Sequence, residues 1–167
     1  VRYDGETQEE VGREILRALE RHYATLTLAF DHSIDSPIPV ILFSRESYYA
    51  ANGMPAWSGG HYDSTDGRIR IPIGGLTSSL TPDLDGTLIH ELTHAFVADI
   101  SRGRAPREIH EGLAQYMEGE RIESRLDAEQ LALLARGQAG GVGGFYLEAL
   151  AFVEYLMRRR GQAGMNE

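Results

Sequence analysis

The sequence predicts a protein of the α+β class, in which a small mixed or antiparallel sheet packs against several helices. Long stretches with apolar residues at helical spacing fill most of the chain, and short apolar runs with strand spacing lie in its first half. With 167 residues, of which 42% are hydrophobic, the chain can bury one core of ordinary size. We therefore expect residues 1–167 to form a single domain.

Composition excludes several classes of protein. The formal net charge of −9 disfavours binding to nucleic acid, which requires a basic surface. The chain has no cysteine, so it holds neither a disulfide nor a thiolate metal site, and any metal ion must bind to His, Asp or Glu. No apolar run approaches the roughly 18 to 20 residues that a membrane span requires, so we expect no such span.

The start of the chain is typical of a piece cut from a longer protein. It begins at Val1 without an initiator methionine, and its first residues are polar and do not form a secretory signal. We expect other domains of the parent chain to be among its partners. The sequence leaves the compartment undetermined.

The first elements follow from local patterns. Thr7-Gln8-Glu9-Glu10 has the form of a capping box, and apolar residues recur behind it at helical spacing as far as Phe30. The apolar run over residues 38–43 predicts a buried strand. Ser44 is expected to cap a short helix, which ends at a turn marked by Asn52-Gly53.

A hairpin is predicted over residues 59–75, with Asp66-Gly67 as its turn. In the second arm, three isoleucines alternate with other residues over 68–73, which is the spacing of a strand with one apolar face. Pro72 cannot donate a hydrogen bond to a neighbouring strand. We therefore expect this second arm to be an edge strand that lies over the cleft.

The longest apolar segment of the second half predicts a deeply buried helix. Thr81-Pro82 supplies an N-cap and a proline at the first helical position, and the helix should run to about Ser101. Three further helices are expected, from Pro106 to about Glu118, from about Ala128 to Ala135, and from near Tyr146 to Gly161.

The buried helix carries the segment His90-Glu91-Leu92-Thr93-His94. Two His residues at positions i and i+4 project from nearly the same face of a helix, so both imidazoles can reach one zinc ion. Glu91 lies on the flank of that face, where it can act on water beside the ion without being a ligand. Composition predicts only about 0.02 chance matches to this pattern. The alternative is a hydrogen-bonded polar cluster in a core helix.

A catalytic zinc site requires a third protein ligand. Glu111 fits best, because it lies on the helix that Pro106 opens and a turn after Ser101 lets that helix fold back. Asp99 and His110 compete with it. Asp99 points away from the two imidazoles if the helix that carries all three residues is regular. His110 points elsewhere if Glu111 faces the metal.

Together, His90-Glu91-Leu92-Thr93-His94-Ala95-Phe96 and Glu111-Gly112-Leu113-Ala114-Gln115-Tyr116 resemble the gluzincin metallopeptidases. The chain is most similar to the bacterial peptidase-MA-like domain family, over most of its length. The resemblance implies a zincin-like fold and one Zn²⁺ held by His90, His94 and Glu111. It also implies a bacterial source, with an extracytoplasmic location as one option.

The resemblance further implies a zinc metallopeptidase that cleaves a peptide or protein substrate. Glu91 would be the general base, and Tyr146 is the best candidate for the donor that stabilises the oxyanion, ahead of Tyr49, Tyr62 and Tyr116. The chain departs from the pattern of its relatives in two places: Glu108 stands where the family usually has Trp, and Gln115 where thermolysin-type relatives have Asp.

Several points stay open at the level of sequence. Gln115 and Asp99 are the two candidates for orienting a ligand imidazole. Arg68 and Arg70 either favour acidic substrates or form a solvated face, and His61 lies either near the cleft or on a plain polar surface. For the whole chain, the alternatives to a peptidase are a metal-binding but catalytically silent interaction module and a zinc hydrolase of a non-peptide amide or ester.

Overall fold

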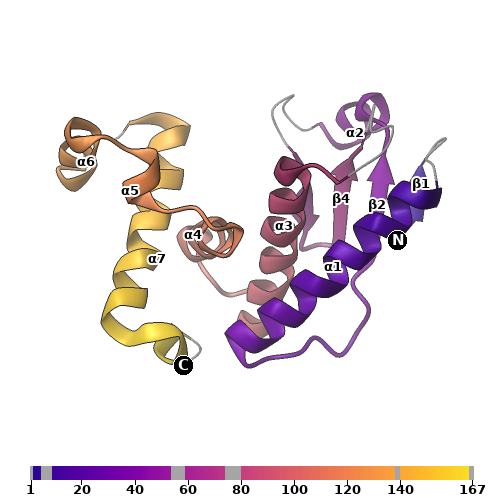
Figure 1. The fold of residues 1–167 in the computed structure, drawn as a ribbon, viewed down its shortest axis with the longest axis horizontal. Helices are drawn as coiled ribbons and strands as arrows, with labels where there is room; N and C mark the ends of the chain where they lie inside the picture. Colours follow the sequence, from indigo (N-terminus) through magenta and orange to yellow (C-terminus); the bar gives the residue numbers. More distant parts are fainter. Residues whose placement is uncertain (1, 5–8, 54–58, 74–79, 138–139, 166–167) are drawn as a thin grey trace.

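A computed structural model of the chain describes residues 2–4, 9–53, 59–73, 80–137 and 140–165 (Figure 1). The strands are β1 (Arg2–Asp4), β2 (Val40–Phe43), β3 (His61–Asp63) and β4 (Arg68–Pro72). The helices are α1 (Glu9–Phe30), α2 (Arg45–Asn52), α3 (Pro82–Ser101), α4 (Arg107–Glu118), α5 (Ile122–Arg125), α6 (Ala128–Ala135) and α7 (Gly141–Met165). The predicted α+β class is therefore confirmed.

The four strands form one mixed sheet in the order β1-β2-β4-β3. β1 and β4 both run parallel to β2, and β3 pairs antiparallel with β4 through the predicted hairpin. Gly67 closes the hairpin with a φ of 68°, a backbone conformation that glycine adopts without strain. The isoleucines of β4 are buried, as their alternation predicted.

The prediction that the second hairpin arm is an edge strand was wrong. β4 lies inside the sheet, between β2 and β3, and the short strand β3 forms the edge. The main-chain N–H groups of Ile69 and Ile73 donate to Pro39 and Phe43, on the β2 side. Because the direction of the main-chain N–H alternates along a strand, the nitrogens of Arg70 and Pro72 face β3. β3 begins opposite Arg70, and Pro72 lies beyond it. The missing donor of Pro72 therefore leaves no partner in β3 unpaired.

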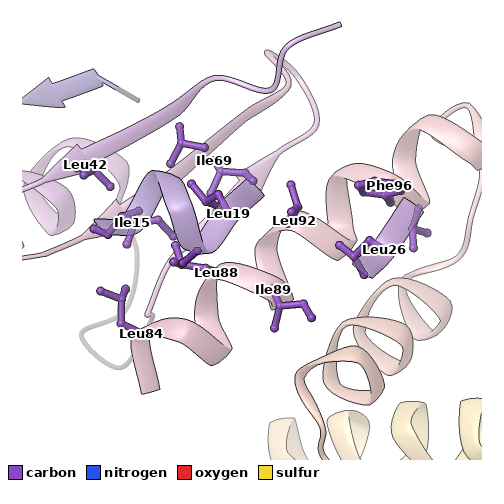
Figure 2. Packing of buried hydrophobic residues seen from close by; sticks show 14 of the residues in the cluster. Ile15, Leu19, Leu26, Leu42, Ile69, Leu84, Leu88, Ile89, Leu92 and Phe96 are labelled. Carbon is purple, nitrogen blue, oxygen red and sulfur yellow. The ribbon is translucent and has the colours of Figure 1, made fainter. Parts of the chain in front are cut away.

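The core lies between the sheet and the pair α1 and α3 (Figure 2). Ile15, Leu19 and Leu26 of α1 meet Leu88 and Phe96 of α3, and the buried residues of β2 and β4 complete the cluster. All of these side chains are at most 6% exposed. Burial of this kind stabilises the fold by about 1.5–3 kcal/mol for each large side chain, which fixes α3 firmly on the sheet.

The second half of the chain packs against the other side of α3. In Figure 1, α4 is seen end-on between α3 and the long helix α7. Gly112 marks the closest approach of α4 to α7, since a Cβ there would lie 2.3 Å from the main-chain oxygen of Ala149. α4 is thus wedged between two helices.

Most predicted elements are confirmed, with small changes. The side chain of Ser44 caps α2, which ends at Asn52 and is followed by Gly53 in the left-handed conformation. β1 and the short helix α5 were not predicted, and α7 already begins at Gly141 and is broken at Gly161. The capping residue Thr7 lies outside the described residues. None of the helices in the described ranges is long and apolar enough to cross a membrane.

Candidate metal centre

Helix α3 positions two of the predicted ligands. The Thr81 hydroxyl accepts a hydrogen bond from the main-chain N–H of Leu84, which starts the helix where the Thr-Pro pair predicted it. One side of the helix is buried in the core. His90 and His94 lie one turn apart with ring centroids separated by 4.9 Å, and their side chains are 19% and 13% exposed. The two imidazoles are adjacent but accessible.

A tight turn brings the third ligand to the same place. Arg102 and Gly103 adopt left-handed conformations at the end of α3, and their N–H groups bond to carbonyls of its last turn. α4 then starts after Pro106 and crosses α3 in contact with it (Figure 1). Glu111, one turn into α4, points its carboxylate at the imidazoles, as the sequence predicted.

The ligand atoms of His90, His94 and Glu111 all lie within 4.8 Å of one another. The Oε2 atom of Glu111 is 3.7 Å from Nε2 of His90 and 3.8 Å from Nε2 of His94. These distances are slightly longer than the roughly 3.3 Å expected between two ligands of a tetrahedral zinc ion. Two imidazoles and one carboxylate form a donor set that zinc accepts, so the residues fit the ion.

Glu91 is buried beside the ligand set. It is only 6% exposed, and its carboxylate accepts a hydrogen bond from the main-chain N–H of Tyr62 on β3. Its Oε2 atom has no hydrogen-bond partner among the described residues. An unpaired buried carboxylate oxygen is costly, and it is a common sign of a functional group. Burial raises the pKa of Glu91 to about 7, against the lowering effects of His90 and the Tyr62 N–H.

The two imidazoles have opposite protonation behaviour. Burial lowers the pKa of His94 to about 3, and the neighbouring positive charge of His90 acts in the same direction. Burial also lowers the pKa of His90, but hydrogen bonds to Glu111 and Glu118 outweigh it and raise the pKa to about 10. Burial raises the pKa of Glu111, but the two imidazoles reverse this and leave it below its usual value.

Glu118, at the end of α4, is a site residue that the sequence reasoning missed. Its Oε2 atom lies 2.9 Å from Nδ1 of His90, on the side of the ring opposite Glu111. The signal was present in the spacing, because Glu118 follows Glu111 by seven residues and therefore lies on the same face of α4 two turns later. Nothing in the local sequence tells which of several glutamates reaches an imidazole.

The two residues predicted as orienting partners are used elsewhere. Asp99 lies 2.7 Å from Nε2 of His32, which also removes it as a third ligand. The Gln115 amide donates to the main-chain oxygens of Glu111 and Tyr146. These contacts place neither candidate at a ligand imidazole, because Asp99 bonds to His32 and Gln115 bonds to the main chain of α4 and α7.

His110 lies closer to the site than expected. Its ring centroid is 5.6 Å from that of His94, although α4 directs Glu111 and not His110 at the ligand set. Among the described residues, the group that could hold a metal ion comprises His90, His94 and Glu111 alone.

Tyr146 lies near the start of α7. Its main-chain oxygen accepts a hydrogen bond from the side chain of Gln115, which follows Glu111 by one turn on α4. This hydrogen bond holds the main chain of Tyr146. That its hydroxyl stabilises an oxyanion stays a prediction. Of the other tyrosines, Tyr116 lies under the guanidinium of Arg121, and the ring of Tyr49 meets that of Tyr48 edge to face.

The remaining candidates lie on the hairpin. Nδ1 of His61, on β3, is 2.9 Å from the hydroxyl of Tyr48 on α2, so His61 faces α2. Arg70 is only 14% exposed and pairs with Asp63 and Asp66. Because the charge of Arg70 is paired within the hairpin, its position does not support a role in attracting acidic substrates.

No model of a known protein family matches the chain, and no curated protein matches it either. The interpretation of the site therefore depends on its residues.

Proposed function

We propose that this chain is a zinc-dependent metallopeptidase of the gluzincin type, with a zincin-like fold. The observation that carries the proposal is the juxtaposition of Glu91 with three convergent ligands. Glu91 is buried, keeps one carboxylate oxygen unpaired, and lies next to His90 on the helix that holds two of the ligands. The hydrogen bond from the Tyr62 N–H accounts for only one of its two carboxylate oxygens.

His90, His94 and Glu111 would hold the ion. Bound there, zinc would polarise the scissile carbonyl and lower the pKa of a water molecule to about 7. Glu91 would take the proton from the attacking water and pass it to the leaving amine. Burial raises the pKa of Glu91 above its usual value, which favours a carboxylate that can both accept and return a proton. The hydroxyl of Tyr146 would donate a hydrogen bond to the oxyanion.

The edge strand β3 supports a peptide as substrate. An extended peptide can add to the free edge of a sheet through main-chain hydrogen bonds. β3 is the edge strand next to the site, and its Tyr62 N–H already reaches Glu91. A peptide paired along β3 would therefore pass beside the general base. This reassigns the predicted substrate strand from β4 to β3.

The test compares the wild-type chain with Glu91→Gln. Purified wild type should bind about one zinc per chain and cleave members of an unbiased peptide library. Glu91→Gln keeps the shape of the side chain and all three ligands but cannot accept the proton, so it should bind zinc equally and lose about 10²–10⁴-fold in the rate of cleavage. Glu120→Gln, a change at an exposed carboxylate that pairs with Arg125, is the control.

Four results would contradict the proposal. A wild type that binds no zinc would remove the metal site. Equal cleavage by Glu91→Gln would remove the base. Cleavage of esters or non-peptide amides without cleavage of any peptide would favour the alternative hydrolase, and zinc binding without any hydrolysis would favour the silent module.

A further inference from the structure

His90 contacts a carboxylate at each of its two ring nitrogens. Nε2 faces Glu111 at 3.7 Å, where the ion would bind, and Nδ1 lies 2.9 Å from Oε2 of Glu118. A neutral imidazole carries one proton, and the nitrogen that holds it cannot bind a metal. An acceptor at Nδ1 therefore keeps the proton there and leaves the Nε2 lone pair for the ion.

A glycine one turn before His90 makes room for Glu118. A Cβ atom at Gly86 would lie 2.9 Å from Oε1 and 3.4 Å from Cγ of Glu118. The first distance is slightly shorter than real Cβ contacts allow, so with a side chain at position 86 the end of the Glu118 side chain would have to shift. Glycine lowers helix propensity in a helix interior, and α3 nevertheless carries it at this position. The space that Gly86 leaves lets the Glu118 carboxylate keep its position beside His90.

The residue four positions after Glu111 cannot take over this task. Gln115 is 4% exposed, and its amide nitrogen is committed to the main-chain oxygens of Glu111 and Tyr146. Its amide oxygen accepts a hydrogen bond from Arg125. Gln115 thus joins α4 to α7, and the orientation of His90 falls to Glu118 at the end of α4.

We propose that Glu118 is the positioning residue of this metal site and that Gly86 is present to admit it. The inference rests on the proposed function in that the site must bind zinc. The inference goes beyond the proposed function because it assigns a role to two further residues, one on each of the helices that carry the ligands. Their only role at the site is to hold the His90 ring in its binding orientation.

The experiment measures zinc affinity by competition with a coloured chelator, using the full chain. Glu118→Ala should weaken zinc binding by roughly 10–100-fold. Glu118→Gln keeps an oxygen that accepts the Nδ1 proton and should recover part of this loss. Glu120→Ala removes a carboxylate two residues away whose partner is Arg125, and should leave the affinity unchanged.

Gly86→Ala provides an independent arm. The methyl group should shift the carboxylate of Glu118 and weaken zinc binding, by less than Glu118→Ala does, because the contact is with the end of a flexible side chain. In a chain that already carries Glu118→Ala, the same change at Gly86 should have little further effect, because the group that it displaces is gone. Far-ultraviolet circular dichroism of the metal-free variants checks that each one folds.

A proton NMR measurement separates orientation from mere packing. The zinc-bound wild type should show a low-field signal from the Nδ1 proton of His90, protected by its hydrogen bond to Glu118. The signal should disappear in Glu118→Ala and return, shifted, in Glu118→Gln.

The outcomes that overturn the inference are distinct from those that overturn the proposed function. Zinc binding by Glu118→Ala as tight as in the wild type would overturn the role of Glu118 and leave the peptidase proposal standing. An equal loss from Gly86→Ala with and without Glu118 would overturn the link between them. Absence of zinc binding by the wild type would overturn the peptidase proposal and this inference with it.

Discussion

At the scale of single residues, the neighbouring groups decide whether the fold favours the protonated or the neutral form of an imidazole. His90 and His94 are one turn apart on the same helix, yet the pKa of the first rises to about 10 and that of the second falls to about 3. Burial acts on both in the same direction. Hydrogen bonds to two carboxylates, from Glu111 and Glu118, reverse its effect on His90 alone. Without a metal, His94 is therefore neutral at pH 7.

His61 supplies a test of such effects at a distance from the metal ligands. Burial lowers its pKa, and the charge of Arg70 acts in the same direction, while Asp63 and Asp66 oppose both. Its other neighbour is the hydroxyl of Tyr48. Because the folded-state pKa lies below the unfolded value of 6.5, the unfolded chain binds the proton first as the pH falls. His61 therefore costs the fold stability below pH 6.5.

We predict that replacing His61 by Asn removes this cost. The free energy of unfolding of the wild type, relative to that of His61→Asn, should decrease between about pH 8 and about pH 5. Urea denaturation of both proteins at the two pH values, with chelator present, measures it. A difference that stays constant or increases toward low pH would show that burial does not depress this pKa.

At the scale of elements, one face of α3 packs in the core and another face carries the residues of the candidate site. Leu88 and Phe96 bury one side against α1 and the sheet, and His90 and His94 occupy the other. Glu91 lies at the border, buried and next to the edge strand β3. Because the core face fixes the helix, the functional side chains start from a rigid base.

The contact between α4 and α7 depends on a missing side chain. We predict that Gly112→Ala destabilises the protein by about 1–3 kcal/mol, since the new methyl group would overlap the main chain of Ala149 and the side chain of Val153. Gly143→Ala is the matched control: it lies in α7 with nothing within 4 Å of its Cβ position. That change should be neutral or stabilise by up to about 1 kcal/mol.

Urea denaturation of both glycine variants gives the comparison. Equal stability of the two would mean that the helices separate without cost. Because α4 also carries Glu111 and Glu118, a forced shift of α4 should weaken zinc binding in Gly112→Ala and leave it unaffected in Gly143→Ala.

At the scale of the whole molecule, the three proposed metal ligands come from two parts of the fold. α3 belongs to the layer that packs on the sheet, and α4 belongs to the group of helices that ends with α7 (Figure 1). The described turn after Ser101 connects them covalently, and the ligand set would connect them a second time. An ion that binds only the folded chain must stabilise it.

We predict a corresponding increase in the temperature of unfolding. Zinc at about one hundred times its dissociation constant should add about 2.7 kcal/mol to the free energy of unfolding. At this chain length, that corresponds to an increase in Tm of several degrees, at about 2–4 °C per kcal/mol. Differential scanning calorimetry with zinc and with chelator measures it. His94→Ala should lose most of the increase, and an undiminished shift in that variant would place the ion elsewhere.

The sequence by itself determined the parts of this protein that depend on neighbours along the chain. The start of α3 at Thr81-Pro82, the turn of the hairpin at Gly67, and the spacing of His90 and His94 follow from local geometry, and the short connection to α4 brings Glu111 into reach. The tertiary structure decided what depends on distant partners. Local patterns do not show that β3 and not β4 is the edge, because sheet order is set by pairing between strands remote in sequence. They also do not show that Glu118 takes the Nδ1 side of His90, because that choice depends on the angle at which α4 crosses α3 and on the space left by Gly86.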